Sequence, residues 1–371
     1  MGSGATIGPC RWLGQRRIDN EDESEVTMSQ VDEHRKLRPS MDDVAAAAGV
    51  SKAAVSKVIR NAYGVSPKMR HKVETAIDQL GYRPSVAARS MRGSSYTLGF
   101  EIPQIGNEFY TQVMRGAADE LSGSGYQLII APAMGETKGA PVLNALVDRQ
   151  VDGFVAISPE VEPDWLERLG QSIPIVLLGR HERSVNYDTV TNDDERGATM
   201  VMTHLFELGH RDIAHITVSG AAQVPAELLP HTIRRRVYET AMTGRRLIPR
   251  VVSGGPLEPD AYLSTIELLR SAQPPTAIFA AHDSLAIGAL RARMELGLTA
   301  DDVSIIGYDN TDLASHPIMA LSTVDQFGRE SGIQAVRLLL ERIQNGRTEA
   351  RHEMIQPELR VRDTTRPVTS P

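Results

Sequence analysis

Residues 41–59 read MDDVAAAAGVSKAAVSKVI, and this stretch decides the fold of the N-terminal part of the chain. Ser40, directly before it, can cap a helix, and Asp43 follows three residues later as in an acidic capping box. Gly49 interrupts the apolar pattern at a point where a left-handed residue ends a helix. Ser51 can cap a second helix. The stretch therefore predicts two short helices joined by a tight turn.

A third helix is predicted immediately downstream. Ser66 and Pro67 combine a capping serine with a proline at the first helical position, and Gly81 can stop the helix. Such a helix-turn-helix arrangement can place its second helix in the major groove of DNA. We expect this all-α head to span residues 39–83, after a disordered extension over residues 1–38 that has no apolar period.

Charge is unevenly distributed along the chain. The 371 residues carry a formal net charge of −7, which taken alone argues against a nucleic-acid partner. Residues 39–95, however, hold nine Lys or Arg and four Asp or Glu, a net of +5, and the residues after 95 carry −11. A basic module joined to an acidic one favours a nucleic-acid binder.

The second helix presents side chains suited to base-pair edges. With its valines turned inward, it directs four side chains outward: Lys52, Ala53, Ser56 and Lys57. Lysine can donate to guanine O6 and N7, and a small apolar side chain can contact a thymine methyl. Further DNA contacts, mainly to phosphates, are expected from polar side chains around it: Ser51, Asn61, Ser66 and Arg70. The alternative is an ordinary three-helix bundle, whose solvent face also carries caps and basic residues.

Residues 83–93 read RPSVAARSMRG, a basic stretch with one large apolar side chain, Met91. A basic helix with an apolar wedge can enter the minor groove and kink the duplex. The alternative is a plain linker between domains.

From Tyr96 onward, short apolar strands alternate with amphipathic helices. The predicted strands cover 98–102, 127–131, 153–157, 175–178, 213–217, 250–253, 277–280 and 303–308. The predicted helices include 109–122, 139–149, 196–208, 261–270 and 284–296. This alternation implies parallel sheets with helices on both faces, and two such runs imply two α/β lobes.

A family resemblance rests on three stretches of this part of the chain: 41–59, VSPKMR at 65–70 and LGYRPSVAARSM at 80–91. Together they resemble the DNA-binding head of the lactose/galactose repressor (LacI/GalR) family. The resemblance implies a sequence-specific repressor that binds a pseudo-palindromic double-stranded DNA operator as a homodimer. It places Lys52, Ala53 and Lys57 at base-reading positions. It also implies a hinge helix over residues 84–95 whose DNA-contacting residues are Ser85, Arg89 and Met91. Methionine is a departure, because the family has leucine as the wedge.

The remaining landmarks resemble the two-lobed, periplasmic-binding-protein-like core of that family, built from two parallel-sheet, Rossmann-like subdomains. They are LGFEIP at 98–103, NEFY at 107–110, NDDERGA at 192–198, LGHRDIA at 208–214, AHDSLAIG at 281–288 and IGYDN at 306–310. The core is expected over residues 96–365, before a tail at 366–371. Its N-lobe is expected at about 96–208 and 326–345, and its C-lobe at about 209–325 and 346–365.

The core is expected to bind a small polar effector such as a sugar. Ligands of open α/β sheets bind beyond the carboxyl ends of strands, which selects the segments after Ile102, Thr191 and Ala280. The resemblance implies six effector-binding residues, the first two flanking the ligand and the rest hydrogen-bonding it: Phe109, Tyr110, Asp193, Arg234, Asp283 and Gln326.

These effector assignments have structural alternatives. Asp193 and Asp283 could each cap a helix, and Arg234 lies in a run of three arginines that could face solvent. His282 stands where the family commonly has Asn, and Val237 where it has Gly. The pocket is therefore remodelled, and purines or other metabolites remain open as ligands.

Enzymatic and metal-binding functions are not expected. The sequence has no Gly-x-Ser-x-Gly, Walker, Gly-x-Gly-x-x-Gly or His-Glu-x-x-His motif. The neighbouring His204, His210 and His215 straddle a helix end and a strand, so we expect no shared zinc site and no cofactor. Two alternatives, a transport receptor with the same core and a sugar-processing enzyme, are disfavoured by the head and by the missing motifs.

The compartment follows from similar observations. Cys10 is the single cysteine, and no apolar run approaches the roughly 18 residues that span a bilayer. The first residues lack the apolar stretch of a secretion signal. We therefore expect a cytoplasmic protein with no membrane association.

Overall fold

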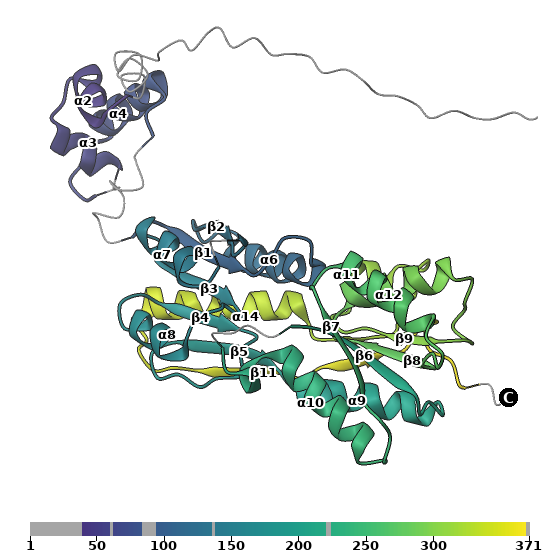
Figure 1. Ribbon diagram of the computed structural model, residues 1–371. Helices are drawn as coiled ribbons and strands as arrows, with labels where there is room; N and C mark the ends of the chain where they lie inside the picture. The colour runs from purple at the N-terminus through teal and green to yellow at the C-terminus, as the bar shows by residue number, and fades with distance from the viewer. Residues whose placement is uncertain (1–38, 60–61, 84–93, 136–137, 220–223, 369–371) are drawn as a thin grey trace, which may run out of the picture. The chain divides into compact units, whose positions relative to one another are not determined.

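The computed structural model describes residues 39–59, 62–83, 94–135, 138–219 and 224–368. The chain divides into two compact units, Met1–Ala88 and Arg89–Pro371, which are described separately below (Figure 1). The expected N-terminal extension and residues 84–93 of the expected hinge lie outside the described residues. None of the helices within those ranges is long and apolar enough to cross a membrane.

The first unit contains helices α2 (Met41–Ala48), α3 (Lys52–Ile59) and α4 (Pro67–Leu80). The predicted capping box before α2 is confirmed, because the Ser40 side chain accepts from the Asp43 N–H and the Asp43 side chain accepts from the Ser40 N–H. Gly49 ends α2 in the left-handed conformation, with φ of 61°. The core of this unit is built around Val44, Val55 and Val73, all fully buried.

The first sheet of the second unit has the strand order β11-β5-β4-β3-β1-β2, and all its pairings are parallel. Its strands are β1 (Thr97–Ile102), β2 (Gln127–Pro132), β3 (Gly153–Ile157), β4 (Ile175–Leu178), β5 (Asp188–Asn192) and β11 (His352–Ile355). Helices α6 (Glu108–Leu121) and α14 (Gly328–Asn345) cover one face, and α7 (Ala140–Asp148) and α8 (Pro163–Gly170) cover the other.

The second sheet has the order β7-β6-β8-β9 and is also parallel. Its strands are β6 (Ile213–Val218), β7 (Arg250–Gly254), β8 (Ala277–Ala280) and β9 (Ser304–Ile306). Helices α9 (Asp194–Glu207) and α10 (Pro230–Thr243) cover one face, and α11 (Glu258–Leu269) and α12 (Asp283–Glu295) the other. Smaller elements are the 3-10 helix η2 (Ala226–Leu228), helix α13 (Asp312–Ser315), and the antiparallel pair β10 (Thr323–Asp325) and β12 (Glu358–Arg360).

The predicted parallel sheets with helices on both faces are confirmed, with element ends within about three residues of expectation. The expected lobe boundaries need two corrections. β11 pairs with β5, so residues 352–355 belong to the N-lobe sheet rather than to the C-lobe. α9 packs with Ile213 and Tyr238 in one core cluster, so it belongs to the C-lobe rather than to the N-lobe. The chain therefore crosses between lobes just before α9.

Helices α6 and α14 approach each other closely because glycines face the contact. A Cβ atom at Gly116 would overlap the carbonyl oxygen of Arg329, and one at Gly332 would overlap the carbonyl oxygen of Val113. The two helices pack without side chains between them at these points. This matters for the site, because α6 and α14 both begin beside the cleft described below.

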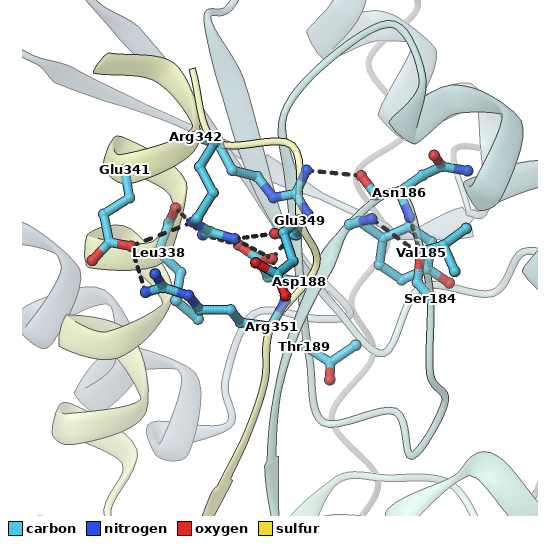
Figure 2. A network of polar contacts seen from close by, with 12 residues as sticks. Ser184, Val185, Asn186, Asp188, Thr189, Leu338, Glu341, Arg342, Glu349 and Arg351 are labelled. Carbon is cyan, nitrogen blue, oxygen red and sulfur yellow. Dashed lines mark hydrogen bonds and ion pairs between the residues drawn. The ribbon is translucent and has the colours of Figure 1, made fainter. Parts of the chain in front are cut away.

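Near its C-terminal end, α14 is tied to the start of β5 by the carboxylate of Asp188 (Figure 2). Asp188 is fully buried and accepts from the guanidinium groups of Arg342 at 2.9 Å and Arg347 at 2.6 Å, and from the Arg351 N–H at 2.8 Å. One buried carboxylate thus pairs with two largely buried arginines, and Glu341 is a second partner of Arg347 at 3.4 Å.

Candidate functional site

The outer face of α3 is polar and accessible. The side chains of Lys52, Ala53 and Lys57 are exposed and that of Ser56 is half-buried, whereas the valines of α3 are buried. This is the orientation expected from the sequence. The Lys52 ammonium forms an ion pair with Asp42 at 2.8 Å, and both side chains remain largely exposed. Such a surface pair is worth little, so Lys52 can exchange it for another partner.

The helix starts beside this face are capped as expected. The Ser51 hydroxyl accepts from the Ala54 N–H at 3.2 Å, and the Ser66 hydroxyl accepts from the Met69 N–H at 3.2 Å. Arg70, in the first turn of α4, is half-buried. Capped N-terminal turns direct their free N–H groups outward, where phosphates can accept from them. The remaining expected DNA contacts lie outside the described residues: Asn61, Ser85, Arg89 and Met91.

A cleft of about 630 Å³ lies in the second unit, lined by residues from both lobes. It opens at the carboxyl ends of the strands. Pro103 follows β1, Ser158 follows β3, and Asn192 ends β5 on the N-lobe side. Val218 ends β6 and Gly254 ends β7 on the C-lobe side. The strand-end rule therefore predicts the position of this cavity correctly.

Four of the expected effector-binding residues meet in this cleft: Phe109, Tyr110, Arg234 and Gln326. The two aromatic rings come from the first turn of α6 and lie edge to face, with centroids 5.9 Å apart. They supply an apolar wall, while the other two residues supply polar groups. A few polar groups against an apolar wall are typical of small-molecule sites.

Arg234 is the buried charge of the cleft. Its Nε donates to Asp194 at 2.7 Å, its Nη1 to the Ala281 carbonyl at 2.6 Å, and its Nη2 to the Gln326 side-chain oxygen at 3.4 Å. The guanidinium carbon lies 3.6 Å from the centre of the Tyr308 ring. These contacts fix the guanidinium plane rigidly.

Asp193 does not line the cleft in the described structure. It is the N-cap of α9, and its Oδ1 accepts from the Arg196 N–H at 3.0 Å. The next residue, Asp194, is buried and faces the cleft, where it contacts Arg234 and His181. The capping alternative therefore describes Asp193, and the expected carboxylate of the pocket is supplied one position later.

Asp283 is likewise placed away from the cleft. It is fully buried, and its carboxylate accepts from the Thr311 N–H at 2.8 Å, the Thr311 hydroxyl at 3.1 Å and the Thr323 hydroxyl at 2.6 Å. The preceding residue, His282, lines the cleft instead. These bonds join the start of α12 to the segment before α13 and to β10, which is a structural role.

We expect Asp283→Ala to reduce the stability of the core. It leaves buried N–H and O–H donors of Thr311 and Thr323 without an acceptor. Each unsatisfied group lowers the free energy of unfolding by about 1–3 kcal/mol. Urea unfolding measures the change, with Asp193→Ala as a matched control expected to lose about 1 kcal/mol of capping energy. An unchanged urea midpoint together with loss of effector binding would restore Asp283 as a ligand contact.

Four further residues line the cleft with buried polar atoms that have no hydrogen-bond partner: Asn192 Oδ1, His231 Nε2, His282 Nδ1 and Asp309 Oδ2. Buried polar groups of this kind are normally satisfied, so they mark a place for a ligand or for water. His282 is visible in the sequence as a departure from the family, and Asp309 lies within the quoted IGYDN. Asp309 also has φ of 137°, and strained backbone of this kind clusters at functional sites.

Burial sets the protonation states of these groups. It lowers the pKa of His282 to about 3 and that of His231 to about 4, so both imidazoles are neutral at pH 7. Burial, reinforced by the neighbouring Asp283, raises the pKa of Asp309 well above its ordinary value. The two imidazoles thus present neutral donors and acceptors to the cleft.

The three clustered histidines have separate partners. His204 contacts Thr365, His210 contacts Ser304, and the His215 ring contacts the Phe279 carbonyl. Within the described residues, no group of three or more His, Cys, Asp or Glu side chains could hold a metal ion.

A helix-turn-helix head with an exposed basic recognition face, joined to a two-lobed α/β core with a polar cleft, defines a ligand-responsive DNA-binding regulator. Residues 40–85 match the model of bacterial regulatory proteins of the lacI family, and residues 202–365 match the periplasmic binding protein-like domain. The chain belongs to the lacI family.

Its relatives include catabolite control protein A of Priestia megaterium, 34% identical over 304 residues that cover 80% of this chain and 90% of the relative. The HTH-type transcriptional repressor PurR of Vibrio campbellii is 32% identical over 337 residues, covering 88% of this chain and 98% of the relative. Among solved structures, the lac repressor dimer bound to operator and the anti-inducer ONPF aligns with a TM-score of 0.73 and 26% identity, covering 89% of this chain and 99% of that one.

Proposed function

We propose that this chain is a sequence-specific transcriptional repressor whose affinity for operator DNA is set by a small polar effector. The observation that carries the proposal is the exposed face of α3, where Lys52, Ala53 and Lys57 stand clear of the head's core. In helix-turn-helix proteins, this position of the second helix reads base edges in the major groove. Ser56 completes the reading face, and phosphates are bound around it by Ser51, Asn61, Ser66 and Arg70.

The repressor is proposed to act as a homodimer on a pseudo-palindromic operator, which fits its similarity to the lac repressor dimer bound to operator. Two heads related by two-fold symmetry contact two half-sites. The segment at 84–95, with Ser85, Arg89 and Met91, contributes minor-groove contacts in this proposal.

The effector, such as a sugar, is proposed to bind in the cleft between Phe109, Tyr110, Arg234 and Gln326, together with Asp194. Polar contacts bridge the two lobes beside it. Gln112 Nε2 donates to the Asn310 carbonyl at 3.1 Å, and the Leu313 N–H donates to Glu108 at 3.2 Å. A ligand that prefers one angle between the lobes shifts the balance between conformations by its difference in affinity for them.

The protein is proposed to work in the bacterial cytoplasm, where operator DNA lies, and to need neither cofactor nor catalysis. The named relatives are transcriptional regulators, which supports a regulator rather than an enzyme.

In vitro selection tests the proposal. The purified full chain selects duplexes from a random library, and the enriched sequences are aligned. We expect a pseudo-palindromic consensus that the protein retards in a gel at low salt. Failure to enrich any consensus over repeated rounds would count heavily against a repressor.

Two head variants should separate base readout from phosphate binding. Lys57→Ala is expected to lose about 1–3 kcal/mol of operator affinity and to relax base preference at one position of each half-site. Arg70→Ala should weaken binding to all duplexes about equally and reduce the salt slope by about 1. Fluorescence anisotropy on the consensus and single-base variants measures both, and identical profiles for the two variants would contradict the assignment.

A further inference from the structure

The first described residues of the second unit are held by one carboxylate, that of Asp152 directly before β3. It accepts from four donors: the Ser94 hydroxyl, the Ser95 N–H at 2.6 Å, the Ser95 hydroxyl at 2.9 Å and the Tyr96 N–H at 2.9 Å. An ionised carboxylate has about four acceptor sites, so all of them are used here. Two of the donors are backbone N–H groups, so these bonds fix the main chain as well as the side chains.

Backbone contacts with the neighbouring strands hold the same segment. The Gln127 N–H donates to the Tyr96 carbonyl at 2.9 Å, and the Asp152 N–H donates to the Thr97 carbonyl at 2.8 Å. The ring of Tyr96 also lies against that of Tyr126, with centroids 5.4 Å apart. Residues 94–97 are therefore fixed between the start of β2 and the start of β3.

The backbone of Tyr96 is held in an unfavourable conformation. Its φ is 52°, in the left-handed region that residues other than glycine seldom adopt. Such conformations persist only where the surrounding contacts over-determine them, and they cluster at functional sites and switch regions. Both polar backbone groups of Tyr96 are bonded, the N–H to Asp152 and the carbonyl to the Gln127 N–H. These contacts impose one conformation on the chain against its local preference.

The place of this contact in the fold connects it with both functional sites. It directly follows residues 84–93, the segment that joins the head to the core in the sequence. It lies at the amino ends of β1 and β3, whereas the cleft opens at the carboxyl ends of the same strands. All six residues of β1 are buried and paired with β2 and β3, over roughly 20 Å. A rigid strand of this kind can carry a displacement from one end to the other.

Resting on the function proposed above, we propose that Asp152 is a positioning residue for operator binding. Its carboxylate fixes the backbone at residues 94–96, from which the chain leads to the head. It thereby restricts the orientations in which the two heads of a dimer meet their half-sites. Without this restriction, the heads lose more orientational freedom on the correct operator, and they also accept a wrong spacing of half-sites more readily.

Half-site spacing tests this role on the full chain. Operators are made from the selected consensus with zero, one or two base pairs inserted at the centre, and each inserted pair turns one half-site by about 35° relative to the other. Fluorescence anisotropy gives the ratio of affinities for the original and the spaced operators in wild type, Asp152→Asn and the control Asp148→Asn. Asp148 is the exposed last residue of α7, four positions before Asp152. We expect the ratio to fall by about 2–30-fold in Asp152→Asn, the usual range for a change in coupling between sites, and to stay unchanged in the control.

Urea unfolding is measured alongside, because Asp152→Asn also removes hydrogen bonds of the core. A variant that is only less stable binds all spacings in the same proportion as wild type, since loss of folded protein lowers every apparent affinity equally. An unchanged ratio in folded Asp152→Asn would therefore overturn the positioning role. Ser94→Ala removes one of the four donors and is the milder variant to use if Asp152→Asn does not fold. Its ratio should fall in the same direction, and an unchanged ratio there would equally contradict the role. Failure of the wild type to select any operator would instead contradict the proposed repressor.

Discussion

Replacement of Arg234 with methionine is expected to abolish effector binding and to lower the free energy of unfolding of the core by about 3–5 kcal/mol. The change removes the partner of Asp194, which is almost fully buried, and leaves that carboxylate with only His181. It also releases Gln326 and the Ala281 carbonyl. Breaking a buried pair by removing one member is costly, because the remaining charge is not compensated.

The neighbouring arginine provides the control. Arg235 forms an ion pair with Glu239 at 2.8 Å, but both side chains are well exposed. Arg235→Met should therefore change stability by less than about 1 kcal/mol and leave effector binding intact. Urea unfolding measures the stability of both variants, and thermal shift with neutral sugars such as D-ribose and D-glucose measures their effector binding. Equal small losses for the two variants would show that Arg234 is a surface residue in solution and would remove it from the site.

Asp188→Ala is expected to lower the free energy of unfolding of the core by a similar amount, about 3–5 kcal/mol. Asp188 does not line the cleft, so the effect is on stability alone. It leaves the buried Arg342 guanidinium without a carboxylate, Arg347 with only Glu341 at 3.4 Å, and the Arg351 N–H without its acceptor (Figure 2). The carboxylate of Asp119 also binds an arginine of α14, Arg329, but at the surface. Asp119→Ala should cost less than about 1 kcal/mol, and urea unfolding of both variants tests the difference.

The contribution of Asp188 should depend on pH in a defined direction. Burial opposes its charge, but the hydrogen bonds from Arg347, Arg342 and the Arg351 N–H hold the pKa of Asp188 below its ordinary value. A lowered folded-state pKa gives stability that is complete above the unfolded value, about 3.9, and is lost as the pH falls through the folded value. The stability difference between wild type and Asp188→Ala should therefore stay constant from pH 7 to 5 and shrink below pH 4. A difference that grew on acidification would contradict the ion-pair assignment.

The sequence predicts the head and most of the two sheets because their signals are local. The helix ends of the head are marked by residues within a few positions of each boundary: Ser40 with Asp43, Gly49, and Ser66 with Pro67. The membership of β11 is different. His352–Ile355 is half-exposed and has no continuous apolar run, so only its pairing with β5 assigns it to a lobe. Pairing over such sequence separations is decided by tertiary packing.

The candidate site shows the same limit at single-residue scale. Phe109, Tyr110, Arg234 and Gln326 line the cleft, whereas Asp193 and Asp283 do not, and their neighbours Asp194 and His282 line it instead. Both differences occur where a helix begins, at the N-cap of α9 and at the first residue of α12, and adjacent side chains of a helix point in directions about 100° apart. A shift of one residue along the sequence therefore separates a capping or buried structural side chain from one that lines the cleft. The three-dimensional structure is needed to tell which of two neighbouring residues lines the cleft.

The most direct test of the central claim is equilibrium binding of the full chain to its selected operator and to a scrambled duplex of equal length, measured at several salt concentrations. A sequence-reading repressor should bind the operator about 10³–10⁷-fold more tightly at physiological salt, and Lys57→Ala should reduce that ratio. Equal affinities for both duplexes, with the same salt dependence, would contradict it.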